Sequence, residues 1–196
     1  RSFSVPKRSG GVREINAPTA ALKELQSWVV DKILKPAFPE VPECTSAYVP
    51  NRSILTHVMP HVEANQLLKL DIKDFFPSIT TRVVFRIFQQ LGYTAAVSRT
   101  LAAITTVNDQ LPQGSPSSPM LSNLAMTGFD LAVSQLCART GLRYTRYADD
   151  LVLSGQCVAG VEDDVIEILR EFGFELNYKK TRTYNKSGEA RIVTGL

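Results

Sequence analysis

The chain has 196 residues and a mass of 21.7 kDa, and 44% of its residues are hydrophobic while 21% are charged. This composition is typical of one globular domain or of two small lobes, and it excludes a disordered or collagen-like chain. The net charge of +3 is too small to identify a partner, and no apolar run approaches the roughly 20 residues that a membrane span requires.

The distribution of charge and cysteine is more informative. Residues 1–13 carry Arg1, Lys7, Arg8 and Arg13 and no acidic residue, which favours a polyanionic partner, with a solvated basic terminus as the alternative. The cysteines are odd in number, widely spaced and without a CxxC pair, so neither a disulfide framework nor a zinc site is indicated and a reducing cytoplasm is expected. Because no signal peptide is visible and the first residue is not Met, we expect a domain of a longer protein.

The N-terminal third predicts a hairpin and then helices. Residues 3–15 indicate two short strands around Ser9-Gly10-Gly11, a hairpin turn signal. The expected elements that follow are a helix over 20–34 closed by Pro36, a loop over 36–52, and a short helix over 53–64 interrupted at Pro60.

Strands and helices alternate in the remainder. Residues 66–73 predict a strand, because apolar side chains alternate with Lys69, Asp71 and Lys73. The later expected elements are a helix from Thr80 or Thr81 to Leu91, a helix over 94–105, a loop over 114–119, a helix over 119–140, a hairpin over 142–155, a helix over 162–172 ended by Gly173, and short strands near 181–184 and 191–193. This order predicts an α+β fold with antiparallel pairing in the middle.

Three acidic residues stand out. Asp71 lies in an apolar strand, where a lone carboxylate is costly unless it is paired, and Asp149 and Asp150 are adjacent at the tip of a hairpin. An Asp-Asp pair in a turn is usually a solvated turn former, but the apolar flanks here favour a hairpin packed in a core. Three carboxylates together form an oxygen-rich site for Mg²⁺, and two such ions about 4 Å apart form the clamp of nucleotidyl transfer.

Five segments of residues 67–196 resemble successive motifs of a reverse transcriptase and follow the order of that family: LKLDIKDFFPSI, LPQGSPSSPMLSNL, RYADDLVLSG, FELNYKKTRTY and RIVTGL. The N-terminal FSVPKRSGGVREINAP and LKELQSWVVDKIL resemble the fingers of the bacterial retron-type branch. The resemblance implies a right-hand polymerase with fingers over 1–65 and 81–112 and a palm over 66–80 and 113–196. The palm is expected to be a ferredoxin-like antiparallel sheet with helices on one face, and no thumb is expected in this chain.

The resemblance also implies roles for individual residues. Asp71, Asp149, Asp150 and the carbonyl of Ile72 would bind two Mg²⁺ ions, for which Mn²⁺ could substitute. Lys180 would protonate the leaving pyrophosphate, and Phe76 would exclude a ribose 2′-hydroxyl, the alternatives being a solvated lysine and an ordinary core phenylalanine. The other nucleotide-binding residues that it implies are Lys7, Arg13, Gln113, Gly114 and Ser115.

The implied activity is that of an RNA-directed DNA polymerase. The partners that it implies are an RNA template, a DNA or RNA primer, dNTPs, a cognate structured RNA and, in a defence system, effector proteins. No membrane partner is expected. Retron enzymes carry Asn-Ala-x-x-His where this chain has His57-Val58-Met59-Pro60-His61, whereas their VTG signature is present as Val193-Thr194-Gly195. A CRISPR- or other defence-associated branch therefore stays open. The rival functions are an RNA-dependent RNA polymerase, disfavoured by Phe76, and a catalytically silent palm that binds RNA, disfavoured by the intact acids.

Overall fold

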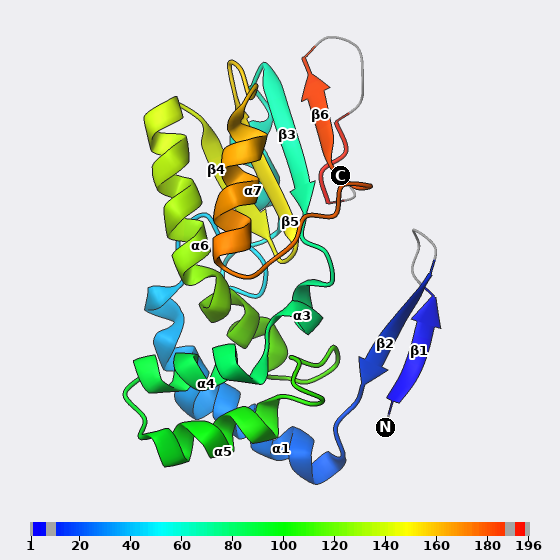
Figure 1. The fold of residues 1–196 in the computed structure, drawn as a ribbon, viewed down its shortest axis with the longest axis vertical. Helices are drawn as coiled ribbons and strands as arrows, with labels where there is room; N and C mark the ends of the chain where they lie inside the picture. The colour runs from blue at the N-terminus through cyan, green and yellow to red at the C-terminus, as the bar shows by residue number, and fades with distance from the viewer. Residues whose placement is uncertain (1, 7–10, 187–190, 195–196) are drawn as a thin grey trace. The chain divides into compact units, whose positions relative to one another are not determined.

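The computed structural model describes residues 2–6, 11–186 and 191–194 and divides the chain into two compact units. One unit contains Arg1–Glu40 and Phe76–Ala125, and the other contains Val41–Phe75 and Met126–Leu196. Figure 1 shows the elements of both units. Within the described ranges, no helix combines the length and the apolar character needed to cross a membrane.

The first unit begins with the predicted hairpin. Strands β1 (Ser2–Pro6) and β2 (Val12–Asn16) pair antiparallel from Ser2 opposite Asn16 to Pro6 opposite Val12. Of the expected turn, Ser9 and Gly10 lie outside the described residues, and Gly11 has a φ of +82°, which a residue without Cβ adopts at little cost. The side chains of β1 are exposed along its whole length, so this strand contributes no side chain to a hydrophobic core.

Helices make up the rest of the first unit. The predicted helix over 20–34 is confirmed as α1 (Ala20–Val29) with a π-helical extension, η1 (Val30–Leu34). The predicted loop is wrong at its start, because a 3₁₀ helix, η2 (Lys35–Glu40), follows directly and Pro36 lies at its beginning, where no backbone donor is needed. The predicted helices after residue 80 are confirmed as α4 (Thr81–Gln90) and α5 (Ala95–Thr105), which are capped by the side chains of Thr80 and Thr94.

Two helices contain a boundary between the units, so each has residues in both. The sequence does not predict α3 (Phe75–Ser78), because a single turn that contains a proline is too short to show helical periodicity. The predicted long helix is confirmed as α6 (Ser118–Thr140), whose second half belongs to the unit that contains the larger sheet.

The second unit is built on a four-stranded antiparallel sheet. Its strands are β3 (Gln66–Asp71), β4 (Arg143–Tyr147), β5 (Asp150–Gly155) and β6 (Arg182–Asn185), in the order β4-β5-β3-β6. The remaining helices are α2 (Ile54–Val58), η3 (Met59–His61) and α7 (Val161–Glu171). Every residue of β5 from Leu151 to Ser154 is buried, so both faces of this inner strand are covered.

The last predicted strand, near 191–193, is wrong. The described segment 191–194 has no strand, and it is attached instead by side chains. Arg191 donates to the carbonyl oxygens of Ala64 and Asn65, at 2.7 and 2.9 Å, and Val193 is buried against Leu67 and Val152. The edge of β3 is already paired with β6, so the segment cannot pair with β3 as a strand.

Candidate active site

The register of β3 and β5 brings the three acidic residues together. Asp71, the last residue of β3, lies directly opposite Asp150, the first residue of β5. The tight turn between β4 and β5 places Asp149 beside them, and the Ile72 N–H donates to the Asp149 carbonyl oxygen at 2.9 Å. Residues that are far apart in the chain are therefore joined at one end of the sheet, as the sequence predicted.

Two side chains from one turn hold the Asp71 carboxylate. This carboxylate is only 3% exposed, and its two oxygens accept hydrogen bonds from Asn177 Nδ2 at 2.9 Å and from Lys180 Nζ at 2.8 Å. The turn that presents both donors is closed by the Lys180 N–H, which donates to the Asn177 carbonyl oxygen. Lys180 thus lies beside the acid cluster, and its role as proton donor stays a prediction. Asn177 was not expected, and its signal is its place in the same motif, FELNYKKTRTY.

The acid cluster carries an excess of negative charge. Burial raises the pKa of Asp149, and the charges of Asp71 and Asp150 raise it further. Burial also raises the pKa of Asp150, although Lys69 Nζ, 3.7 Å from its carboxylate, acts in the opposite direction. Burial alone would lower the pKa of Lys180, but its hydrogen bond and ion pair with Asp71 outweigh burial and raise it. The cluster therefore attracts further cations.

The donor atoms of this cluster suit a hard divalent cation. Asp71, Asp149 and Asp150 offer carboxylate oxygens, which Mg²⁺ and Mn²⁺ prefer. Burial first, and then the neighbouring carboxylates, raise the pKa of Asp149 and of Asp150, so a cation bound among them would relieve a real electrostatic cost. Among the described residues, no three His, Cys, Asp or Glu side chains are already arranged to coordinate a metal. In this conformation the ammonium groups of Lys180 and Lys69 compensate part of the negative charge instead.

Thr194 of the VTG segment lies near the same carboxylates. Its side-chain oxygen is buried and lowers the pKa of Asp150, although no hydrogen bond of ordinary geometry joins the two groups. The backbone of Thr194 has a φ of +51°, an uncommon conformation for a residue with a branched side chain. Thr194 is therefore adjacent to the acid cluster, which the sequence alone does not predict.

The predicted nucleotide-binding loop contacts β2 in the first unit. The Asn16 N–H donates to the Gln113 carbonyl oxygen at 2.8 Å, and Gly114 has a φ of +112°. A Cβ on Gly114 would lie 3.0 Å from Cγ2 of Ile15, so glycine is required here both for conformation and for space. Arg13 lies on the same strand with an exposed side chain.

The other predicted residues differ in how free they are to bind a nucleotide. Gln113 Oε1 is buried without a hydrogen-bond partner within the described part of the chain, whereas the Ser115 hydroxyl donates to Gln26 Oε1 at 2.8 Å. Phe76 is half-buried, unlike its neighbour Phe75, which is buried. Lys7 lies outside the described residues. The nucleotide-binding roles of all these residues stay predictions.

Residues 5–193 match the family described as reverse transcriptase (RNA-dependent DNA polymerase). The chain belongs to the reverse transcriptase family. It is 39% identical to the Retron Mx65 reverse transcriptase of Myxococcus xanthus, over 98% of this chain and 49% of that protein. It is also 39% identical to the Retron Ec86 reverse transcriptase of Escherichia coli, over 100% of this chain and 62% of that protein. The chain thus spans about half of one relative and less than two thirds of the other, and the predicted retron-type resemblance is confirmed.

Solved structures confirm the predicted fold. A telomerase from Candida albicans, in complex with a fragment of telomeric RNA, matches all of this chain and 43% of its own with a TM-score of 0.66 at 13% identity. A telomerase from Candida tropicalis matches 99% of this chain with a TM-score of 0.68 at 12% identity. At this level of identity the likeness establishes the fold of fingers and palm and nothing about the substrate.

This reverse transcriptase chain contains a buried histidine pair: His61 matches the His of the Asn-Ala-x-x-His pattern, and His57 stands where that pattern has Asn. His57 and His61 are 0% and 1% exposed, and both bind the hydroxyl of Thr145 on β4, at 2.8 and 2.7 Å. Thr145 donates to the His57 carbonyl oxygen, so its two lone pairs accept from His57 Nδ1–H and His61 Nε2–H. Ser154 then donates to His61 Nδ1 at 2.6 Å. The pair therefore belongs to the core, with both rings neutral.

The neutral histidines predict a loss of stability in acid. Burial, with the neighbouring His61, lowers the pKa of His57 to about 3, and burial lowers that of His61 to about 4. The unfolded chain therefore binds more protons between these values and about 6.5, so stability falls as the pH falls through this range. We expect a loss of about 2 kcal/mol per histidine at pH 5 relative to pH 7.

The variant His57→Asn keeps a donor for Thr145 but cannot be protonated. We expect it to lose less stability than the wild type between pH 7 and pH 5, by about 2 kcal/mol, in urea denaturation followed by circular dichroism. All carboxyl groups are common to both proteins, so they cancel in the comparison. Equal pH dependence in the two proteins would contradict a neutral, buried His57.

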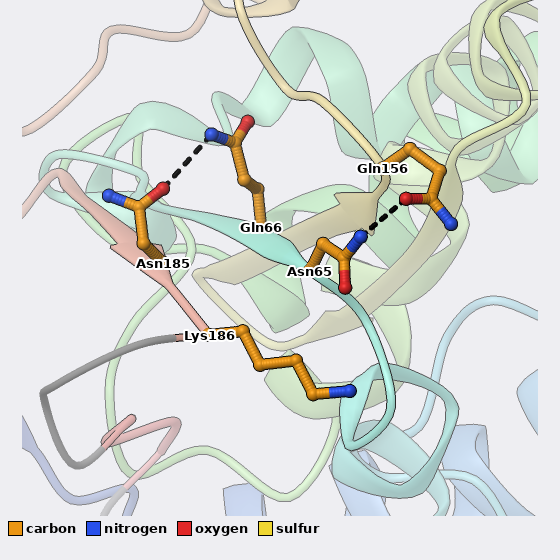
Figure 2. Close-up of a pocket in the computed structure, with 5 residues that line it drawn as sticks. All are labelled: Asn65, Gln66, Gln156, Asn185 and Lys186. Carbon is orange, nitrogen blue, oxygen red and sulfur yellow. Dashed lines mark hydrogen bonds between the residues drawn. The ribbon is translucent and has the colours of Figure 1, made fainter.

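A recess lies at the end of the sheet away from the acid cluster. Figure 2 shows the side chains that line it, which come from the start of β3, the end of β6 and the segments beside them: Asn65, Gln66, Gln156, Asn185 and Lys186. Asn65 donates to Gln156, and Gln66 donates to Asn185 at 2.9 Å. The recess contains no carboxylate and lies at the opposite end of β3 from Asp71, so it does not compete with the acid cluster as the catalytic site.

Proposed function

We propose that this chain is the polymerase portion of a retron reverse transcriptase, which adds dNMPs to a primer 3′ end while copying RNA. One observation carries the proposal: in a chain of this family, Asp71 and Asp150 face each other in adjacent strands with Asp149 in the turn beside them. A catalytically silent scaffold would not need to maintain three mutually repelling carboxylates.

We assign the unit that contains the four-stranded sheet to the palm and the helical unit with the β1–β2 hairpin to the fingers. The units change at residues 41, 76 and 126, whereas the boundaries predicted from the sequence are residues 66, 81 and 113, which nothing in the structure tests as limits of fingers and palm. The proposed partners are an RNA template, a DNA or RNA primer, dNTPs, a cognate structured RNA and effector proteins. The relatives named as retron reverse transcriptases support the RNA template of this set.

In the proposed reaction, separate residues bind the metal ions, donate a proton and bind the nucleotide. Asp71, Asp149, Asp150 and the Ile72 carbonyl would hold two divalent ions, which when bound supply charge for activating the 3′-hydroxyl and for stabilising the leaving pyrophosphate. Lys180, whose pKa is raised, stays protonated at neutral pH and can give its proton to the pyrophosphate. Arg13 would bind the triphosphate and Phe76 would contact the sugar.

Nucleotide incorporation on an oligo(dT)-primed RNA template, with Mg²⁺ or Mn²⁺, tests the proposal. A reverse transcriptase extends the primer with dNTPs, an RNA-dependent RNA polymerase extends it with rNTPs, and a silent scaffold binds the template without extending the primer. Chelation of the metal should stop dNTP incorporation completely. Template binding without any extension, in the presence of both metals, would contradict the proposal.

Sugar selection gives a separate test of Phe76. The variants Phe76→Val and Phe76→Ala should raise rNTP incorporation relative to dNTP incorporation, because they open space for the 2′-hydroxyl. We expect the ratio of kcat/KM values to shift by about tenfold or more, since a lost steric contact changes discrimination by about 1–3 kcal/mol. The neighbouring Phe75→Leu, a buried substitution, is the control and should leave the ratio unchanged. An unchanged ratio in the Phe76 variants would make Phe76 an ordinary core residue.

A further inference from the structure

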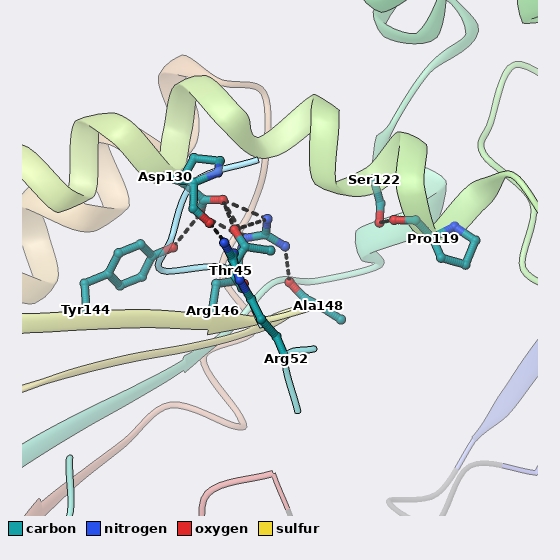
Figure 3. Close-up of polar contacts among 9 residues, drawn as sticks. Thr45, Arg52, Pro119, Ser122, Asp130, Tyr144, Arg146 and Ala148 are labelled. Atoms are coloured by element: carbon teal, nitrogen blue, oxygen red, sulfur yellow. Dashed lines mark hydrogen bonds and ion pairs between the residues drawn. The ribbon is translucent and has the colours of Figure 1, made fainter. Parts of the chain in front are cut away.

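A fully buried ion pair lies behind the turn that carries Asp149. Asp130 on α6 and Arg146 on β4 are both 0% exposed, and Arg146 Nη2 lies 2.7 Å from Asp130 Oδ2. Figure 3 shows the pair between the helix and the strand, with Ala148 beside the guanidinium. A buried ion pair adds little to stability compared with apolar residues of similar volume, so its presence needs another explanation.

The guanidinium of Arg146 binds Asp130 and the Thr45 hydroxyl on one side, the latter from Nη2 at 3.2 Å, and a main-chain carbonyl on the other. Nε and Nη2 donate to the two oxygens of Asp130, at 2.8 and 2.7 Å, in a bidentate arrangement. Nη1 donates to the main-chain carbonyl oxygen of Ala148 at 3.1 Å. The carboxylate therefore fixes the plane of the guanidinium, and the guanidinium in turn fixes the carbonyl.

The Asp130 carboxylate, which orients Arg146, is itself held by other hydrogen bonds. Besides Arg146, Asp130 accepts hydrogen bonds from the Tyr144 hydroxyl at 2.8 Å and from the Thr45 hydroxyl at 2.8 Å. Thr45 cannot move freely, because Arg52 donates to its carbonyl oxygen at 2.6 Å and to that of Pro42 at 2.7 Å. With donors on both oxygens, the Asp130 carboxylate has one orientation.

The carbonyl that Arg146 binds belongs to a strained residue. Ala148 has a φ of +57°, a left-handed conformation that costs about 1 kcal/mol or more for a residue with a Cβ. The peptide plane between Ala148 and Asp149 is rigid, so holding its oxygen also sets the direction in which the Asp149 backbone leaves the turn. The Asp149 carbonyl is fixed from the other side by the Ile72 N–H.

We propose that Arg146, oriented by Asp130, is a positioning residue that aims the Asp149 carboxylate at the metal site. The proposal deepens the function proposed above and rests on it. Arg146 contacts neither nucleotide nor metal, and it acts through the Ala148 carbonyl. The competing explanation is that the pair only holds α6 against β4.

The variant Arg146→Lys separates the two explanations. A lysine keeps a positive charge beside Asp130, but its single nitrogen cannot bind the carboxylate bidentately and the Ala148 carbonyl together. We expect kcat to fall about 10- to 100-fold and Mn²⁺ affinity, measured by electron paramagnetic resonance without nucleotide, to fall about tenfold. KM for dNTP should stay within about threefold, because the triphosphate contacts are untouched.

Val165→Ala is the matched control for lost stability. Val165 is a fully buried residue of α7, and its truncation destabilises the same unit without touching the turn. All variants are compared at a temperature at which circular dichroism shows them folded. The control should keep wild-type kcat and Mn²⁺ affinity. Should Arg146→Lys fail to fold, Asp130→Glu, which keeps the charge pair but displaces the guanidinium, is measured in its place with the same expectations.

The outcomes distinguish this proposal from the proposed function. Wild-type kcat and Mn²⁺ affinity in a folded Arg146→Lys, or losses equal to those of Val165→Ala, would overturn the positioning role. If the wild-type protein binds Mn²⁺ but incorporates no nucleotide, the polymerase proposal fails, and the Mn²⁺ affinities still decide whether Arg146 aims Asp149. A wild-type protein that binds no Mn²⁺ overturns both.

Discussion

The variant Asp149→Asn is expected to abolish dNTP incorporation while the chain stays folded. The substitution removes a charged oxygen ligand from the proposed metal clamp and leaves the size of the side chain almost unchanged. We expect kcat to fall by about a thousandfold or more, which corresponds to about 4 kcal/mol of lost transition-state stabilisation. Primer extension under single-turnover conditions measures the loss.

The same variant should not lose stability at neutral pH. Burial raises the pKa of Asp149, and so do the charges of Asp71 and Asp150. The folded protein therefore binds the proton more tightly than the unfolded chain, and the ionised Asp149 destabilises the fold increasingly as the pH rises from about 3.8 through the raised pKa. Removing the charge should make the variant at least as stable as the wild type at pH 7, and this advantage should vanish below pH 3.8.

The exposed carboxylate of Asp163, in the first turn of α7, provides the matched control. Asp163→Asn makes the same chemical change away from the acid cluster and should leave incorporation unchanged. Near wild-type polymerisation by Asp149→Asn would refute the metal clamp. Unfolding of Asp149→Asn at pH 7 would refute the electrostatic account of the cluster.

The second large effect is expected at Arg13. This residue lies on β2, the strand whose end is hydrogen-bonded to the loop of Gln113 and Gly114. A planar guanidinium binds phosphate oxygens bidentately, and the contact should strengthen as charge develops on the leaving pyrophosphate. Arg13→Ala should lower kcat/KM for dNTP by about 100-fold, equivalent to about 3 kcal/mol, and Arg13→Lys should restore only part of it.

The basic residues around the hairpin turn serve as controls for Arg13. Lys7 and Arg8 lie outside the described residues, and their alanine variants should mainly weaken template binding and flatten its salt dependence. Steady-state dNTP kinetics at two salt concentrations distinguishes these roles. Equal, salt-sensitive defects at Arg13, Lys7 and Arg8 would show that the N-terminal cations form one interchangeable patch rather than a specific triphosphate site.

Local physical chemistry determined much of this protein from its sequence. The threonines that cap α4 and α5, the alternation along β3 and the tight hairpin around Asp149 and Asp150 all involve interactions between residues close in the chain. The order of the motifs also identified the family and the three acidic residues. Such features are visible in sequence because helix caps, strand periodicity and turns depend on near neighbours.

Only the tertiary structure decided which side chains surround those acids. Asn177 and Lys180 reach Asp71 from a turn that follows α7, and Arg146 reaches the Ala148 carbonyl only because Asp130 on a distant helix holds it. A strand was expected at 191–193, where side-chain contacts of Arg191 replaced backbone pairing. Each of these contacts depends on the register of the sheet and on how helices pack on it. These are properties of the whole fold, which no short window of sequence contains.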